Sequence, residues 1–142
     1  MEDKILSSIL RRASEEGYAK KMGMRAVALH PGHAVVEMTP SEADTNIFGM
    51  VHGGAIFSLM DEAFQLSCNS HGTVAVALSV HVVYHRPPDN HGSLRAESRE
   101  IHRSRKTATY DIRVTDEKGG LISSCQATAY RKREKLPFLG EE

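Results

Sequence analysis

The sequence predicts an α+β fold in which an antiparallel sheet wraps around one long helix. Residues 53–70 lack proline, and good helix formers dominate positions 55–66. After Gly72 the chain is strand-like as far as residue 131, with turn residues between its extended runs. Strands that are segregated from helices favour α+β over an alternating α/β order. At 142 residues, the chain is expected to be one domain, residues 1–142.

The segment before the long helix predicts a short helix and a hairpin. Apolar residues recur at helical spacing near the N-terminus, and Gly17 is expected to end that helix. A Pro-Gly turn then separates two short apolar runs, which is typical of a hairpin. The expected elements are a helix at 3–17, strands at 24–29 and 34–38, one helical turn at 41–44 and a loop at 45–51.

The segment after the long helix predicts four strands in succession. Residues of alternating polarity between Thr107 and Val114 place one apolar set on a single face of a strand. The polar residues 132–142 are expected to form a loosely held tail. The four expected strands are 73–85, 94–103, 106–116 and 121–131.

The long helix, expected from about Gly53 to Ser70, has an unusually broad apolar face. On a helical wheel this face covers about half of the circumference, so the helix should be buried. Asp61 and Glu62 lie just beyond its opposite edges, whereas a surface helix would carry acids opposite the apolar stripe. The residues of the face are Ile56, Phe57, Leu59, Met60, Ala63, Phe64, Leu66 and Ser67.

Two adjacent glycines at the start of this helix suggest a polar function. Glycine is unfavourable in a helix by roughly 1 kcal/mol relative to alanine, but it lets a ligand approach the backbone closely. The first N–H groups of a helix lack internal partners and lie at the positive end of its dipole. Gly53 and Gly54 could therefore polarise a carbonyl oxygen, or they could simply allow tight packing against a sheet.

Composition argues against several classes of protein. Lys and Arg together number 18, as do Asp and Glu, so no nucleic-acid partner is expected. The charged N-terminus does not resemble a signal peptide, and no run approaches the ~20 apolar residues of a membrane span. We therefore expect a cytoplasmic protein without a membrane partner. Cys68 and Cys125 should be reduced core residues, with a disulfide as the alternative.

The eight histidines do not predict a metal site. His81 and His85 would share a strand face but lie about 13 Å apart, which is too far for one ion. His30 and His33 flank a turn and could approach each other, but no cluster of Cys or acids accompanies them. We expect neither a metal nor another cofactor.

Several polar and glycine positions around the long helix could carry chemistry. Taken singly, each has a structural alternative: Asn46 could cap a turn, His52 could cap the helix, and Ser79 could be a filler in its strand. Either acid on the helix could instead pair with an arginine. The positions are Asn46, His52, Gly53, Asp61, Glu62 and Ser79.

Together these residues resemble the hotdog-fold thioesterases, and specifically the phenylacetate-degradation (PaaI-like) acyl-CoA thioesterases. The shared pattern is Asn46-x-x-Gly49-x-x-His52-Gly53-Gly54, followed by an acid nine residues after the histidine and by a small hydroxyl residue eighteen further on. The resemblance covers nearly the whole chain. It implies a sheet of five or six antiparallel strands around the long helix, and hydrolysis of an acyl-CoA thioester to a carboxylic acid and free CoA.

The resemblance also implies a role for each matching residue. Asp61 corresponds to the catalytic carboxylate, acting as general base or as nucleophile. The N–H of Gly53 corresponds to the donor that polarises the thioester carbonyl. Asn46 corresponds to an amide that holds the water or the carbonyl, His52 to a histidine that supports the loop, and Ser79 to a hydroxyl that orients the water. Glu62 has no counterpart.

Geometry adds a requirement for a second subunit. Gly53 and Asp61 are eight residues apart, which is about 12 Å along one helix, whereas a base must lie within hydrogen-bond reach of the attacking water. Asp61 must then serve the Gly53 of another chain. We expect a two-fold homodimer with antiparallel helices and shared sites, and the resemblance adds a homotetramer as a further possibility.

The sequence gives weaker signals for the residues that bind the CoA nucleotide and the acyl group. Arginine forks suit phosphates, so the candidates for binding the CoA nucleotide are Arg86, Arg103, Arg105 and Lys106, with solvated turn charges as the alternative. The turn at 103–107 departs from the family, which often has glycine there. Gly54 and Phe48 are expected beside the acyl group, and Phe57 and Phe64 are expected in the core.

Two other functions fit the same fold. A non-catalytic acyl-CoA sensor would bind the thioester without cleaving it, but it would not need the acid at Asp61. A dehydratase acting on β-hydroxyacyl thioesters would pair a histidine with an acid, and His52 makes that conceivable. The loop from Asn46 to Gly54 favours thioester hydrolysis over dehydration.

Overall fold

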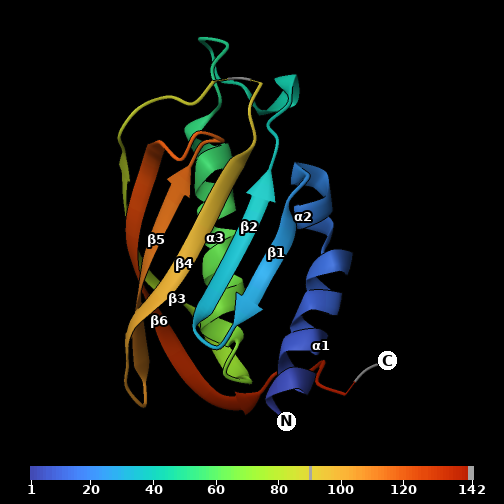
Figure 1. The fold of residues 1–142 in the computed structure, drawn as a ribbon. Coiled ribbons are helices and arrows are strands. Elements are labelled where there is room, and N and C mark those ends of the chain that lie inside the picture. Colours follow the sequence, from blue (N-terminus) through green and yellow to red (C-terminus); the bar gives the residue numbers. More distant parts are fainter. Residues whose placement is uncertain (90, 141–142) are drawn as a thin grey trace.

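The computed structural model describes residues 1–89 and 91–140, and its centre is a long helix inside a curled sheet (Figure 1). The helix is α3 (Gly53–Asn69), preceded by α1 (Glu2–Glu15), α2 (Gly17–Met22) and a short 3₁₀ turn, η1 (Glu42–Asp44). All strand pairs are antiparallel, in the order β1-β2-β4-β5-β6-β3. The strands are β1 (Arg25–His30), β2 (His33–Met38), β3 (Thr73–Tyr84), β4 (Leu94–Arg103), β5 (Thr107–Thr115) and β6 (Leu121–Lys135).

Strand β3 does not lie beside β4, although β4 follows it in the chain. β4, β5 and β6 pair in succession, and β3 is added beyond β6, with Tyr84 opposite Ser123. The four strands follow in the expected chain order, but they are not all neighbours, because the chain crosses from the sheet edge back to its middle after β3. One side of β3 is bonded to β6, and its other side is an unpaired edge within the described chain.

Helix α3 is buried against the sheet as its apolar face predicts. Phe64 packs edge-on against Tyr110 of β5, with ring centroids 5.5 Å apart. Ser67, the polar member of the face, shares a 2.6 Å hydrogen bond with Ser98 of β4, so its hydroxyl is satisfied in the core. The buried apolar residues of α3 are Ala55, Ile56, Leu59, Met60, Ala63, Phe64, Leu66 and Cys68.

Both ends of the chain differ from the sequence prediction. The single N-terminal helix is broken at Glu16, whose extended backbone ends α1 and begins α2, so Gly17 opens a helix and does not end one. The expected loose tail is also wrong, because β6 continues to Lys135 and the next residue, Leu136, is buried. Leu136 donates its N–H to the Gly72 carbonyl at 3.1 Å. Of the expected tail, residues 141–142 lie outside the described residues.

Two further observations concern the sequence candidates. Cys68 and Cys125 are both buried free thiols. His30 and His33 stack across the β1–β2 turn with ring centroids 5.7 Å apart, as their spacing allowed.

Among residues 1–89 and 91–140, no helix is long and apolar enough to cross a membrane.

Candidate active site

The loop before α3 is closed by the side chain of Asn46. Its Oδ1 accepts hydrogen bonds from the N–H groups of Phe48 at 2.9 Å and Met50 at 3.1 Å. Gly49 allows the tight turn, because its φ of 75° is rarely accessible to other residues. The side-chain carbonyl of Asn46 therefore caps the turn, which was the structural alternative for this residue. Its amide N–H groups have no partner in the described chain. Phe48, at the loop tip, is 75% exposed.

His52 ends the loop and caps α3. Its Nδ1 accepts a hydrogen bond from the Gly54 N–H at 2.7 Å. Because Nδ1 is the acceptor, the proton of the neutral ring lies on Nε2, where it can be donated to a ligand. A Cβ at position 54 would lie only 2.9 Å from Nδ1, so glycine is what lets the histidine fold back over the helix start. Gly54 therefore serves the cap.

Gly53 presents a helical amide that has no acceptor in the described chain. The next N–H groups are used, that of Gly54 by the His52 ring and that of Ala55 by the His52 carbonyl. The hydroxyl of Tyr84, at the end of β3, donates to the Gly53 carbonyl at 3.1 Å and fixes this first turn. An oxygen placed at the Gly53 N–H would meet both a hydrogen-bond donor and the positive end of the helix dipole.

Asp61 lies two turns further along α3, at the surface of the single chain. No hydrogen bond or ion pair occupies its carboxylate within the described residues. Desolvation by the surrounding protein, and then the charge of Glu16, raise the pKa of Asp61 above its ordinary value of 3.8. The helix rise places Asp61 about 12 Å from Gly53 along the axis, so one chain does not bring the base and the donor together.

Ser79 is exposed on β3, beside a β-bulge between Ala77 and Ser79. Bulges re-aim side chains and are common near active sites. Tyr84 is level with Gly53, and Ser79 lies about 17 Å back along the strand from Tyr84. Asp61 is displaced by a similar amount along α3 in the same direction, because α3 and β3 run oppositely. Ser79 and Asp61 thus both lie away from Gly53 in the same direction, by about 17 Å and about 12 Å.

The basic candidates are not equivalent. Arg86 bonds Asp116 at 2.6 Å, which ties the segment after β3 to the β5–β6 turn. Arg103 bonds the ring of His71, just after the C-terminal end of α3. Both guanidinium groups therefore already have partners in the chain.

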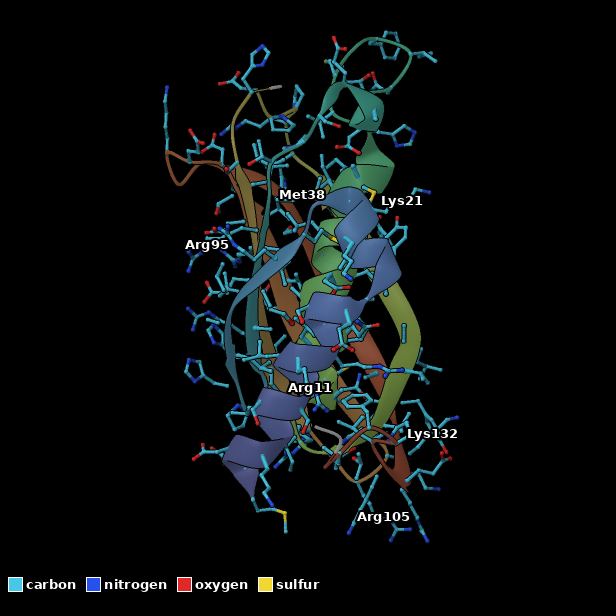
Figure 2. The ribbon with its side chains drawn as sticks, turned by 90° about the vertical axis from the view of Figure 1, so that its right-hand side faces the viewer. Arg11, Lys21, Met38, Arg95, Arg105 and Lys132 are labelled. Atoms are coloured by element: carbon cyan, nitrogen blue, oxygen red, sulfur yellow. The ribbon has the colours of Figure 1, made fainter. Side chains whose placement is uncertain are left out.

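Arg105 and Lys106 are exposed in the turn between β4 and β5. Figure 2 shows Arg105 near Lys132, at the end of the molecule opposite the loop that precedes α3. Within one chain these cations are therefore remote from Gly53.

Comparisons with known proteins decide the family. A model of the family described as "Thioesterase superfamily" matches residues 48–123, which span the end of the loop, α3, β3, β4, β5 and the first residues of β6. The chain belongs to the thioesterase superfamily. Its six strands around one helix form the hotdog fold that the sequence resemblance implied.

Individual relatives agree with this assignment. The acyl-coenzyme A thioesterase PaaI of Escherichia coli K12 is 32% identical over 113 residues, covering 80% of this chain and 81% of the relative. The solved structure of E. coli PaaI, from the phenylacetic acid degradation operon, has a TM-score of 0.89 at 28% identity, covering 94% and 96% of the two chains. Streptococcus mutans smu.793 bound to acetyl CoA has a TM-score of 0.76 at 26% identity, covering 80% and 91%.

Sequence reasoning missed two features of this thioesterase. Tyr84 had no signal, because its bond to Gly53 joins residues 31 positions apart. Glu62 was placed on the border of the apolar face, but it is only 6% exposed and lies beside Glu16 and Gln65.

Within the described residues, no group of three or more His, Cys, Asp or Glu could hold a metal ion.

Proposed function

We propose that this protein hydrolyses acyl-CoA thioesters to a carboxylic acid and free CoA, at two sites shared by the subunits of a homodimer. The observation that carries the proposal is the placement of Gly53 and Asp61. A helical amide without an acceptor and a carboxylate without a partner lie about 12 Å apart on one helix, each suited to one half of the reaction. Membership of the thioesterase superfamily and similarity to an acyl-CoA thioesterase support the choice of substrate.

In the proposed reaction the thioester oxygen accepts a hydrogen bond from the Gly53 N–H of one subunit. Asp61 of the other subunit takes a proton from water as the water oxygen attacks the carbonyl carbon. The negative charge that forms on the oxygen is stabilised by Gly53 and the helix dipole. When the intermediate collapses, the carbon–sulfur bond breaks, and the CoA thiolate leaves and takes up the proton.

The other site residues have supporting roles in this proposal. Asn46 and His52 hold the loop and the first helical turn, and their remaining N–H groups face the thioester. Ser79, which lies in the same direction from Gly53 as Asp61, orients the attacking water from the same subunit. Phe48 contacts the acyl group from the loop side, together with the backbone at Gly54.

The proposed dimer gives a partner to the exposed edge of the sheet. β3 is unpaired on one side and carries exposed apolar side chains such as Leu78, which is 61% exposed. A two-fold axis that matches Gly53 to Asp61 of the partner passes beside Phe57, midway between them. Two such dimers could pair into a tetramer.

Antiparallel helices also bring the basic turn to the site. The C-terminal end of one α3 then lies near the N-terminal end of the other, so Arg105 and Lys106 of one subunit approach the partner's loop. We assign the CoA phosphates to these two cations, with Arg103 beside them. Arg86, bonded to Asp116, contributes by holding its segment in place.

The test is release of free thiol from a panel of aryl and straight-chain acyl-CoAs by the wild type and by Asp61→Asn. We expect turnover by the wild type and a loss of at least about a hundredfold in the variant. Tight CoA binding without thiol release would support a sensor instead. Single turnover in H₂¹⁸O tests for direct attack by Asp61, because hydrolysis of the resulting mixed anhydride at the Asp61 carbonyl would put unlabelled oxygen into the first product.

A further inference from the structure

A chain of hydrogen bonds at the C-terminal end of α3 links a partly buried acid to an exposed arginine. His71, two residues after the end of α3, places its Nε2 2.7 Å from Oε1 of Glu100 in β4. The hydroxyl of Tyr110 in β5 donates to the same oxygen at 2.9 Å. On the other side of the ring, a guanidinium nitrogen of Arg103 bonds to Nδ1. The proposed mechanism uses neither the histidine nor the acid.

A β-bulge in β4 brings the acid and the arginine to the same face of the strand. Residues three apart in a regular strand point to opposite faces, but the register of β4 against β5 shifts just after Glu100. Glu100 is opposite Tyr110, and Arg103 is opposite Ala108. Tyr110 and Ala108 lie two apart on β5 and are both buried. Glu100 and Arg103 therefore share the face of β4 that is turned toward α3.

The partners of His71 fix the position of its proton. An arginine can only donate, so Nδ1, which faces Arg103, acts as the acceptor and carries no proton. Nε2 then carries the proton of the neutral ring and donates it to the Glu100 carboxylate. Burial raises the pKa of Glu100, but the hydrogen bonds from His71 and Tyr110, together with nearby positive charge, lower it below its ordinary value of 4.5. The acid is therefore ionised and accepts both hydrogen bonds.

A neutral acceptor holds Arg103 without cancelling its charge. Arg86 shows the contrast, because it is paired with the Asp116 carboxylate at 2.6 Å. In the described chain, Arg103 bonds through one guanidinium nitrogen and the residue is exposed, so the rest of its planar fork can bind an anion. It lies next to the turn that carries Arg105 and Lys106, the two cations assigned to the CoA phosphates.

We propose that His71 and Glu100 are positioning residues for Arg103, which binds a phosphate group of the CoA nucleotide. The carboxylate holds the ring, and the ring holds the guanidinium at the end of α3. This proposal rests on the proposed function, in which CoA is part of the substrate. A long side chain that is already ordered loses less conformational entropy on binding, so the chain of bonds should strengthen CoA binding about two- to tenfold.

The experiment measures the affinity of the full-length protein for CoA by calorimetry. It also measures the KM for an acyl-CoA and for the acyl-pantetheine with the same acyl group, which lacks the nucleotide. His71→Leu removes both bonds of the ring, and Arg103→Gln removes the proposed phosphate ligand. His33→Leu is the matched control, because it removes a similar bond, of 2.6 Å, to Glu97 on the same strand as Glu100.

We expect CoA to bind His71→Leu about two- to tenfold more weakly than the wild type or the control, and Arg103→Gln about tenfold or more weakly. The KM for the acyl-CoA should rise accordingly, relative to that for the acyl-pantetheine. In the Arg103→Gln background, His71→Leu should have no further effect, because the ring then has nothing to position. His71→Gln should keep most of the affinity, because an amide can accept from Arg103 and donate to Glu100.

Two results would overturn the proposal: a CoA affinity of His71→Leu equal to that of the control, or a loss of equal size in the Arg103→Gln background. If His71→Leu does not fold, ¹⁵N NMR of the wild-type histidine rings tests the chain of bonds directly, with His71→Gln assigning the signal. A proton on Nε2 of the neutral ring supports the chain, and a proton on Nδ1 contradicts it.

The affinity measurements do not depend on turnover. A protein that binds CoA with the expected pattern but releases no thiol from any acyl-CoA would contradict the proposed function alone. A protein that binds no CoA would overturn both proposals.

Discussion

Subunit complementation between Gly53→Pro and Asp61→Asn chains is the sharpest test of a shared site. Proline at position 53 would remove one N–H that bonds to nothing in the described chain. Proline is favoured in the first turn of a helix, and the φ of −65° and ψ of 137° at His52 suit a residue before proline. A Cβ at position 53 meets the Tyr84 ring at 3.5 Å, an ordinary contact, so the substitution should not disturb the fold.

The rates expected for a site shared between subunits and for a site within one subunit differ widely. Loss of one oxyanion donor costs about 10²–10³ in kcat, or about 2.7–4 kcal/mol, and loss of the general base costs at least about a hundredfold. In a hybrid dimer with shared sites, one site keeps both groups and the other lacks both. The hybrid should then recover about half of the wild-type rate per dimer, because the two sites of a two-fold dimer are equivalent.

The assay is thiol release by hybrids purified through two different tags, compared with each parent variant. Gly53→Ala is the matched control, because it adds a Cβ at the same place but keeps the N–H. A hybrid no more active than its parents, in a dimer confirmed by mass, would refute a site built across subunits.

Further predictions follow from the cap, the sheet edge and the two acids. His52→Ala should lower the free energy of unfolding by about 1 kcal/mol, while His52→Asn keeps the cap; urea melts compare them. Leu78→Asp should shift sedimentation toward monomer, and Ile101→Asp, 56% exposed on β4, should not. Because the base works only when ionised, kcat/KM should fall with acid through a midpoint above 3.8, the ordinary pKa of Asp61. Since its pKa is raised in the folded state, Glu62 should make unfolding easier as pH rises from 4.5 to about 8, and Glu62→Gln should remove this trend.

The sequence predicted best what depends on local residues. Helix α3, the capping role of His52 and the alternation along β5 all follow from neighbours within a few positions. The motif from Asn46 to Gly54 is one loop and one helix start, so its geometry depends mainly on contacts between neighbouring residues.

What the sequence did not predict depends on distant contacts. β3 pairs with β6, which lies far from it in the sequence, and no local pattern records that pairing. Glu62 is buried beside Glu16, 46 positions earlier, where an extended residue breaks the N-terminal helix. The buried Leu136 likewise depends on the Gly72 carbonyl. The roles of Asp61 and Ser79 stay predictions that need a second subunit.

The pairing of β3 with β6 has a consequence for biosynthesis. β3 is translated long before β6, so a nascent chain carries an apolar strand without the strand it pairs with until residues near 135 have left the ribosome. Such exposed strands invite aggregation. Chains stalled after β5 should therefore depend on chaperones, and the protein should fold only once β6 has been made.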